Sequence, residues 1–261
     1  MSLRRALARL RVSPPVNQLR YHAYRDVLMA FPRRHQCNLC KWTGRRFLTF
    51  VHRSILCPKC GSMVRHRLIG AALTECADLR SVIHSKSAVL HMSAEYCLRR
   101  VIEPIAGEYV RGDFMTADCD IHVDLTNMHE IADGRFDVLI ACDVIEHIEN
   151  DIGAFREIRR VLRPGGTAII TVPQVDAEVA TYVDSAQVTE AQRTAAFGQH
   201  DHVKLYGNDF ADRLRSAGFT VRVVEAGDFT RELVERHVLS PPVLNPPPFD
   251  FNRRRIFFAR A

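Results

Sequence analysis

The sequence predicts an α/β protein in which a small cysteine module precedes a doubly wound, mostly parallel sheet of seven strands. Two observations carry this prediction. Two Cys-x-x-Cys pairs lie close together near the N-terminus, and from residue 87 onward short apolar segments alternate with helical patterns. A length of 261 residues and a hydrophobic content of 47% are enough for one large domain with a core and one small module.

Basic residues are concentrated at the N-terminal end. Residues 1–67 contain 15 Lys and Arg against one acid, whereas residues 68–261 contain 21 Lys and Arg against 29 acids. This asymmetry is typical of a surface that meets an anionic partner, such as nucleic acid, a phosphorylated substrate or lipid headgroups, although a solvated basic face has the same pattern. We expect a basic arm at 1–34, a cysteine module at 35–67 and an α/β domain at 68–261.

The chain carries no pattern of a membrane or secreted protein. No segment has the roughly 18 to 20 continuous apolar residues that cross a bilayer, and the N-terminus lacks the apolar stretch of a secretory signal. Its Arg-rich, acid-poor start also fits an organellar transit peptide. We expect a cytoplasmic protein without a transmembrane segment, whose other four cysteines are reduced thiols: Cys76, Cys97, Cys119 and Cys142.

The two Cys-x-x-Cys pairs predict a structural zinc ribbon. Cys37 and Cys40 are separated from Cys57 and Cys60 by 16 residues, a spacing expected for a tetrahedral four-thiolate zinc site. Each pair directs two sulfurs at one point, and Gly61 gives the second turn its freedom. Because so small a module buries little apolar area, metal binding would supply its folding energy. A redox dithiol pair is the alternative interpretation.

The elements of the α/β domain follow the cysteine module in order. Residues 63–82 have the pattern of a linking helix with one apolar face. Asp151 is placed to cap a later helix, which Pro164-Gly165-Gly166 ends before the next strand. A strand, a crossover helix and a strand give parallel neighbours. Candidate strands lie at 88–91, 109–112, 121–123, 136–142, 167–172, 219–225 and 255–259, and a late helix lies at about 208–217.

Acidic residues follow the second, third and fourth of these strands, at Asp113, Asp124 and Asp143. Because the carboxyl ends of parallel strands meet at one edge of a sheet, we expect the three carboxylates on one rim. Each acid is alternatively the N-cap of the helix after its strand. The rim is therefore the candidate ligand site of the domain.

One segment resembles a known family. Residues 136–148, followed by residues 160–166, resemble the fourth strand and the following helix of class I S-adenosylmethionine-dependent methyltransferases of the type 11 kind, whose usual text is FDxxxxxxxxEH and LRPGG. The similarity covers about residues 87–225. The whole chain is similar to a bacterial group that joins CPxCG and RHR, here residues 57–61 and 65–67, to such a domain. The resemblance implies a Rossmann-like sheet with the cofactor across the carboxyl ends of the first strands.

The resemblance also implies which residues hold S-adenosylmethionine. Asp113, about 20 residues beyond the first strand, would bind the ribose hydroxyls. Asp124 would accept a hydrogen bond from the adenine amine, with Leu125 beside the ring. Asp143 and Val144 would lie near the transferable methyl group.

The first strand departs from the usual family pattern. His91 stands in place of the acidic residue, and Met92-Ser93-Ala94-Glu95 replaces the glycine-rich turn. The zinc-ribbon group is similar in carrying an LHxAxE turn, and small Ser93 and Ala94 allow the backbone to approach a cofactor closely. The resemblance therefore places His91, Ser93 and Glu95 in the cofactor site.

Histidines are the candidate catalytic bases. Transfer of a methyl group from a sulfonium requires mainly alignment of the acceptor, and a hydroxyl acceptor benefits from a base. The candidates are His147, just past the fourth strand, and His200 or His202 in a segment that resembles the group's FGQxDHVRxYG text. We expect His147 and His202, with Asp143, at the methyl-transfer site. A bond from His147 to nearby backbone is the alternative role.

The same residues resemble a metal site. Asp143, Glu146 and His147, with His202, resemble the ExxEH-plus-histidine set of metal-assisted RNA 2′-O-methyltransferases. Asp143 replaces the first Glu of that set. A second metal here is therefore a further hypothesis.

Three classes of function follow from the sequence. The one we expect is an S-adenosylmethionine-dependent methyltransferase acting on a hydroxyl of a glycan, glycolipid or other small molecule. The second is an RNA methyltransferase whose cysteine module and basic arm hold the polyanion. The third is a binding module without catalysis. Salt-sensitive retention of RNA separates the first two, and affinity for the cofactor separates both from the third.

Overall fold

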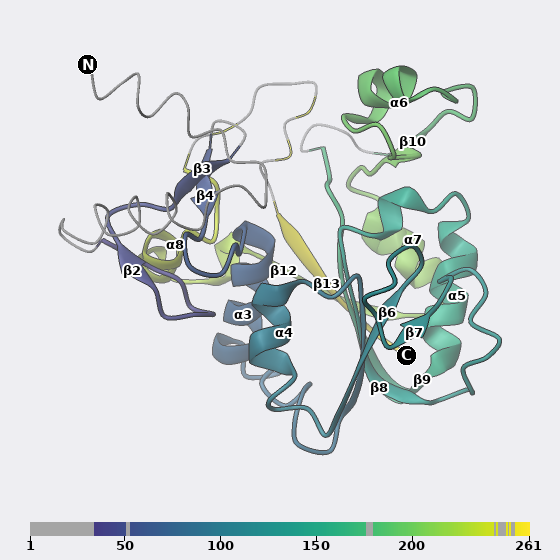
Figure 1. The fold of residues 1–261 in the computed structure, drawn as a ribbon, viewed down its shortest axis with the longest axis horizontal. Coiled ribbons are helices and arrows are strands. Elements are labelled where there is room, and N and C mark those ends of the chain that lie inside the picture. Colours follow the sequence, from purple (N-terminus) through teal and green to yellow (C-terminus); the bar gives the residue numbers. More distant parts are fainter. Residues whose placement is uncertain are drawn as a thin grey trace.

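The computed structural model shows one α/β sheet with helices on both faces and the cysteine module beside one of them (Figure 1). Apart from Arg34, the predicted basic arm lies outside the described residues. The structure describes residues 34–50, 53–175, 180–242, 244, 249, 251 and 254–261.

The central sheet has seven strands in the order β12-β13-β9-β8-β5-β6-β7. β13 is antiparallel to both of its neighbours, and the remaining strands run parallel to one another. The predicted doubly wound, mostly parallel, seven-stranded sheet is confirmed. Its strands are β5 (Ala88–Met92), β6 (Glu108–Asp113), β7 (Ile121–His122), β8 (Phe136–Cys142), β9 (Leu162–Thr171), β12 (Thr220–Glu225) and β13 (Arg255–Arg260).

Side chains alternate between two apolar layers along the inner strands, as the two-residue period of a strand requires. In β8, Leu139 and Ala141 face one layer, whereas Val138 and Ile140 face the other. Helices α5 (Asp151–Val161) and α7 (Phe210–Ser216) cover the first layer. Helices α3 (Val64–Glu75), α4 (Tyr96–Ile102) and α8 (Arg231–His237) lie on the other side, with the cysteine module (Figure 1).

Strand β9 begins earlier than the sequence predicts. Helix α5 ends at Val161, and Leu162 already pairs with Phe136, so Pro164-Gly165-Gly166 forms a bulge within β9. The register then resumes with Thr167 opposite Val138. Gly165, with φ of 80°, takes the left-handed conformation that the bulge needs.

The cap of α5 also differs from the prediction. Asn150 is the N-cap and accepts a hydrogen bond from the Gly153 amide at 3.0 Å. Asp151 is instead the first helical residue, and its buried carboxylate binds Arg213 at 2.7 Å and Lys204 at 3.2 Å. Such a tertiary ion pair is invisible to a local capping pattern.

The cysteine module contains two short antiparallel hairpins, which are β1 (His35–Gln36) with β2 (Thr43–Gly44) and β3 (Leu48–Phe50) with β4 (Arg53–Leu56). α3 follows at once and crosses residue 67, and the boundary predicted there remains a prediction. α3 ends at Glu75, earlier than the 63–82 helix that the sequence predicts. The remaining elements are the 3-10 helices η1 (Ile145–His147) and η2 (Ala226–Asp228), β10 (Tyr182–Val183), α6 (Glu190–Phe197) and β11 (Lys204–Leu205).

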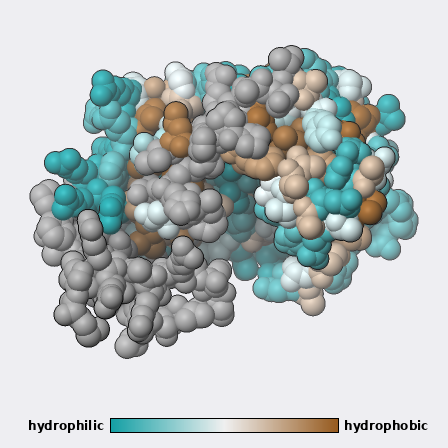
Figure 2. Space-filling model, turned by 90° about the horizontal axis from the view of Figure 1, so that it is seen from above, coloured by the Kyte–Doolittle hydropathy of each residue, from teal (hydrophilic) through white to brown (hydrophobic). Residues whose placement is uncertain are grey.

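The surface seen from above mixes hydrophilic and hydrophobic residues (Figure 2). Among the residues with an assigned structure, no helix has both the length and the apolar character for a bilayer crossing.

Candidate active site and cysteine cluster

The candidate ligand site lies at the carboxyl edge of the sheet, where β5 and β8 are neighbours. β5 connects through α4 to β6 on one side, whereas β8 connects through α5 to β9 on the other, so the winding reverses between them. Ligands of doubly wound sheets bind at such a reversal. Each strand is followed at once by a left-handed residue that is not glycine, Ser93 with φ of 46° and Asp143 with φ of 51°. Strained backbone of this kind is concentrated at functional sites.

Asp113 lies at the end of β6 and is already oriented. Its carboxylate accepts hydrogen bonds from the amides of Met115 at 2.7 Å and Thr116 at 2.8 Å, and from the Ser93 hydroxyl at 2.9 Å. Burial opposes ionisation, but the amides of Thr116 and Met115 outweigh it, so the pKa of Asp113 is lowered. Asp113 is therefore a fixed anion.

A cavity of about 360 Å³ lies beside Asp113. This volume is within the range of small-molecule sites. Ser93 and Asp113, two of the predicted cofactor residues, line it. The other lining residues are Ala94, Tyr96, Arg99, Arg111, Gly112, Thr116, Asp118 and Cys119.

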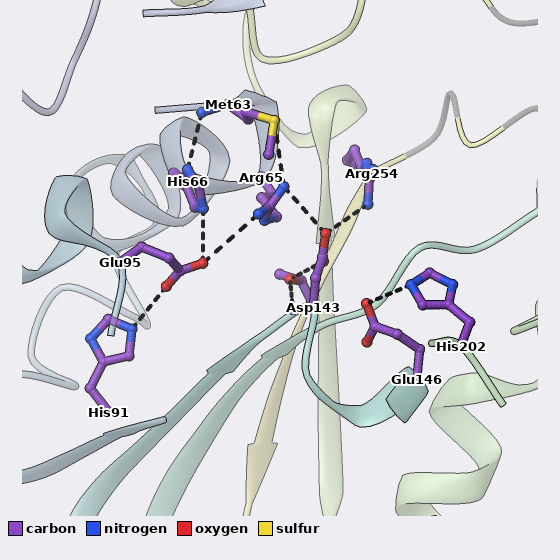
Figure 3. Close-up of polar contacts among 10 residues, drawn as sticks. Met63, Arg65, His66, His91, Glu95, Asp143, Glu146, His202 and Arg254 are labelled. Atoms are coloured by element: carbon purple, nitrogen blue, oxygen red, sulfur yellow. Dashed lines mark hydrogen bonds and ion pairs between the residues drawn. The ribbon is translucent and has the colours of Figure 1, made fainter. Parts of the chain in front are cut away.

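Glu95 is held by two histidines (Figure 3). It accepts from His66 Nε2 at 3.0 Å and from His91 Nε2 at 3.1 Å. His66 Nδ1 accepts from the Met63 amide, and His91 Nδ1 lies 2.6 Å from the Tyr109 hydroxyl, which fixes both rings. Burial opposes ionisation of Glu95, but the bonds from His66 and His91 outweigh it and lower its pKa.

His91 thus has both ring nitrogens engaged and no exposed surface. Its predicted place in the cofactor site remains a prediction, and the geometry supports orientation of Glu95 as its contribution. His66 is not among the site residues predicted from the sequence. The sequence feature that could have pointed to His66 is the RHR text after the second cysteine pair. That text does not by itself indicate which residue the histidine contacts.

Asp143 binds two arginines rather than the histidines (Figure 3). Its carboxylate accepts a hydrogen bond from the Thr171 hydroxyl at 2.7 Å. Arg65 Nη1 lies 3.2 Å away and Arg254 Nη1 lies 3.5 Å away. Burial opposes ionisation, but Arg65 and Arg254 outweigh it and lower the pKa of Asp143. Neither arginine is among the site residues predicted from the sequence, although Arg65 belongs to the RHR text.

A second cluster joins η1 to the segment before β11. The rings of His147 and His202 meet edge to face with centroids 5.0 Å apart, and His202 Nε2 lies 3.9 Å from Glu146 Oε1. Glu146, His147 and His202 each have one nitrogen or oxygen that could bind a metal ion, and these three atoms lie within 4.8 Å of one another. Glu146 Oε2 and His202 Nδ1 are buried and have no hydrogen-bond partner within the described part of the chain.

The protonation of this cluster is set by burial. Burial, and then the charge of Asp143, raise the pKa of Glu146 well above its ordinary value. Burial, and then the charge of His147, lower the pKa of His202. His202 is thus neutral near pH 7 and able to accept a proton. His200, with 59% of its side chain exposed, pairs loosely with Asp201.

Three other predicted cofactor residues lie neither around the cavity beside Asp113 nor in the cluster of Glu146, His147 and His202. Asp124 accepts hydrogen bonds from the amide and the hydroxyl of Thr126, each at 2.8 Å. Leu125 is buried in the hydrophobic core, and Val144 is partly buried and packs against this core. Their roles toward a cofactor remain predictions.

The four cysteines of the two pairs converge. Cys37 Sγ lies 3.8 Å from Cys60 Sγ, and Cys40 Sγ lies 3.6 Å from Cys57 Sγ. All four sulfurs lie within 4.8 Å of one another. Zinc–sulfur bonds of about 2.3 Å in a tetrahedron place sulfurs about 3.8 Å apart. The cluster has the dimensions of a four-thiolate zinc site.

Arg67 is buried beside this cluster. It donates hydrogen bonds to the carbonyls of Ser62, His237 and Val238 at 2.6 to 3.0 Å. Its guanidinium also lies 4.2 Å above the centre of the Phe47 ring. Burial lowers the pKa of Arg67 to about 10. Negative charge on the nearby cysteine sulfurs acts in the opposite direction and raises this pKa. Arg67 thereby ties the cysteine module to the end of α8.

Parts of the chain are similar to known proteins. Residues 103–170 match the family model described as a methyltransferase domain. Over 56 residues the chain is 43% identical to Thiol S-methyltransferase TMT1A of Homo sapiens. The matched segment covers 22% of this chain and 22% of that protein.

Solved structures similar to the chain include two bacterial proteins. An S-adenosylmethionine-dependent methyltransferase from Mesorhizobium loti is 16% identical with a TM-score of 0.46, over 72% of this chain and all of that one. The YcgJ protein from Bacillus subtilis is 13% identical with a TM-score of 0.48, over 75% of this chain and 97% of that one. The family match runs from the end of α4 into β9, within the observed Rossmann-like sheet, so this part of the chain is similar to a methyltransferase domain.

Proposed function

We propose that the protein is an S-adenosylmethionine-dependent methyltransferase. The observation that carries this proposal is the fixed Asp113 carboxylate beside a cavity at the carboxyl ends of β5 and β6, on one side of the reversal of the sheet. Carboxylates at the end of this strand bind ribose hydroxyls in doubly wound folds. Ser93 and Ala94 are small enough for the cofactor to approach the backbone closely, so the residues present fit S-adenosylmethionine.

We further propose that the acceptor is a hydroxyl of a glycan, glycolipid or other small molecule. When bound, S-adenosylmethionine would supply the methyl group of its sulfonium to the acceptor oxygen and would leave as S-adenosylhomocysteine. The hydroxyl proton passes to a neutral base, for which His202 is the candidate and His147 the neighbour. The RNA alternative depends on a basic arm that lies outside the described residues.

The first test of this function is cofactor binding followed by an acceptor screen. Calorimetry is expected to show binding of S-adenosylmethionine and S-adenosylhomocysteine. Transfer of a tritiated methyl group is then measured to pools of alcohols, glycans and glycolipids, with RNA and thiols as separate arms. Failure to bind either nucleoside at millimolar concentration would reject the enzyme and favour a binding module.

Replacing Asp113 by Asn is expected to weaken S-adenosylhomocysteine binding about 10- to 150-fold, because charge-assisted hydrogen bonds to the ribose are lost. Asn keeps an oxygen that accepts from the Met115 and Thr116 amides, so the turn is retained. Asp118→Asn is the matched control, since this carboxylate lines the same cavity but is 90% exposed. We expect less than a twofold change in that control. An unchanged affinity in Asp113→Asn would remove the residue from the site.

We also propose that the four cysteines bind structural zinc. The sulfur–sulfur distances fit a tetrahedral site. A zinc ion with four thiolates carries a net negative charge, which would offset the buried charge of Arg67. No carboxylate pairs with Arg67 among the residues that the structure covers, so the cluster is the natural source of that compensation.

A further inference from the structure

Arg65 extends from the first turn of α3 to a place between Glu95 and Asp143, beyond the carboxyl ends of β5 and β8 (Figure 3). Its side chain is 12% exposed, and it lies between the Asp143 carboxylate at 3.2 Å and the Glu95 carboxylate at 4.0 Å. Asp143 follows β8 and Glu95 follows β5, which are the two strands that flank the reversal. A residue of the N-terminal region therefore places a cation at the ligand-binding edge of the sheet.

The guanidinium of Arg65 has N–H groups that make no hydrogen bond within the described residues. Its Nε is buried and has no hydrogen-bond partner in the described ranges. Nη1 donates to the weak acceptor Met63 Sδ at 3.7 Å. Both neighbouring carboxylates have other donors, because Glu95 accepts from two histidines and Asp143 from Thr171. An arginine with unused N–H groups at the ligand-binding edge of a sheet is suited to a carboxylate, which takes two parallel hydrogen bonds. Arg65 does not line the cavity beside Asp113, but lines a separate small one of about 20 Å³.

We propose that Arg65 binds the α-carboxylate of the methionine part of S-adenosylmethionine. This inference rests on the proposed function. Ser93 and Ala94 line the cavity that would hold the nucleoside, and the next residue, Glu95, faces Arg65. The amino-acid end of the cofactor would therefore extend along this turn to Arg65. The carboxylate is the anionic group of the cofactor, and Glu95 and Asp143 are available to its ammonium group.

The cysteine module gains a role from this assignment. The Cys57 amide donates to the Ser62 carbonyl, which also accepts from Arg67, and α3 begins two residues later. The module thus sets the start of the helix that carries Arg65. It completes the cofactor site rather than forming a separate binding unit.

The test compares ligands with and without the amino-acid end. Calorimetry measures S-adenosylhomocysteine, its decarboxylated analogue S-adenosyl-3-thiopropylamine, and 5′-methylthioadenosine, each against the wild type and Arg65→Met. We expect Arg65→Met to weaken S-adenosylhomocysteine about 10- to 150-fold and 5′-methylthioadenosine less than twofold. Removing the carboxylate from the ligand should weaken wild-type binding by a similar factor and have no further effect in Arg65→Met.

Two controls separate binding from structure. Arg254→Met removes the other cation on Asp143, and we expect it to retain the wild-type preference for the carboxylated ligand. Arg65→Lys keeps the ion pairs without the bidentate geometry, and we expect an intermediate loss for S-adenosylhomocysteine alone. Zinc content and melting temperature report whether each variant folds.

Three results would overturn the proposal. An equal loss for all three ligands would make Arg65 structural, and tighter binding in Arg65→Met would mean that it occludes the crevice. An equal loss of the carboxylate preference in Arg254→Met would assign the effect to Asp143. If the wild type binds none of the ligands, the proposed function itself fails, which is a distinct outcome.

Discussion

Cys57→Ser is expected to remove zinc from the protein and unfold the cysteine module. Structural zinc contributes about 10 to 16 kcal/mol in small zinc-binding peptides, more than a module with two short hairpins gains from burial. Wild-type protein should contain about one zinc per chain by mass spectrometry. In the variant, amide exchange across residues 35–62 should become fast, while the strands of the central sheet remain protected.

The control for this experiment is Cys76→Ser. Cys76 is a free, partly exposed cysteine just after α3 and lies outside the four-sulfur cluster. This variant should keep its zinc and its exchange pattern. A wild-type protein that contains no zinc and still protects the module from exchange would reject the metal site.

The effect should reach the cofactor site as well. Because Arg65 and His66 follow the cluster within ten residues of Cys57, removal of zinc should weaken S-adenosylhomocysteine more than 5′-methylthioadenosine. The same ligand pair therefore reports on the module and on Arg65. Equal weakening of the two ligands would point to a general loss of stability instead.

Local patterns predicted the sheet and the cysteine cluster well. The apolar run of β8 and its acid at Asp143 are adjacent in sequence, and Cys-x-x-Cys turns are local, so their geometry follows from short-range chemistry. The bulge at Gly165 was missed because the Pro-Gly-Gly text equally fits a turn.

The contacts that join the two halves of the chain could not be predicted this way. His66 and Glu95 are 29 residues apart, and Arg254 and Asp143 are 111 residues apart. Their pairing depends on how α3 packs against the sheet and on where β13 pairs within it. The partners of such buried charges are determined by the tertiary structure. No local sequence pattern around either residue indicates which charge it will pair with.

His202→Ala is expected to lower turnover about 10²- to 10⁴-fold and to leave S-adenosylhomocysteine affinity nearly unchanged, because proton removal matters on the way to the transition state. The acceptor is the one found in the tritium screen. His200→Ala is the matched control, since His200 lies two residues away and is largely exposed. It should keep full turnover. A rate loss in His202→Ala that tracks weaker cofactor binding would mean a structural role.

The pH profile tests the same base independently. Burial and the neighbouring His147 lower the pKa of His202, so its neutral form predominates above a pKa that lies below the ordinary value of about 6.5. Activity should therefore be lost as pH falls through that pKa and should be level above it. Replacing His147 by Gln removes a nearby positive charge, which should raise the pKa of His202 and shift the rising limb to higher pH. A limb that keeps its position in His147→Gln and persists in His202→Ala would assign the titration to another group, and methyl transfer would then depend on alignment alone.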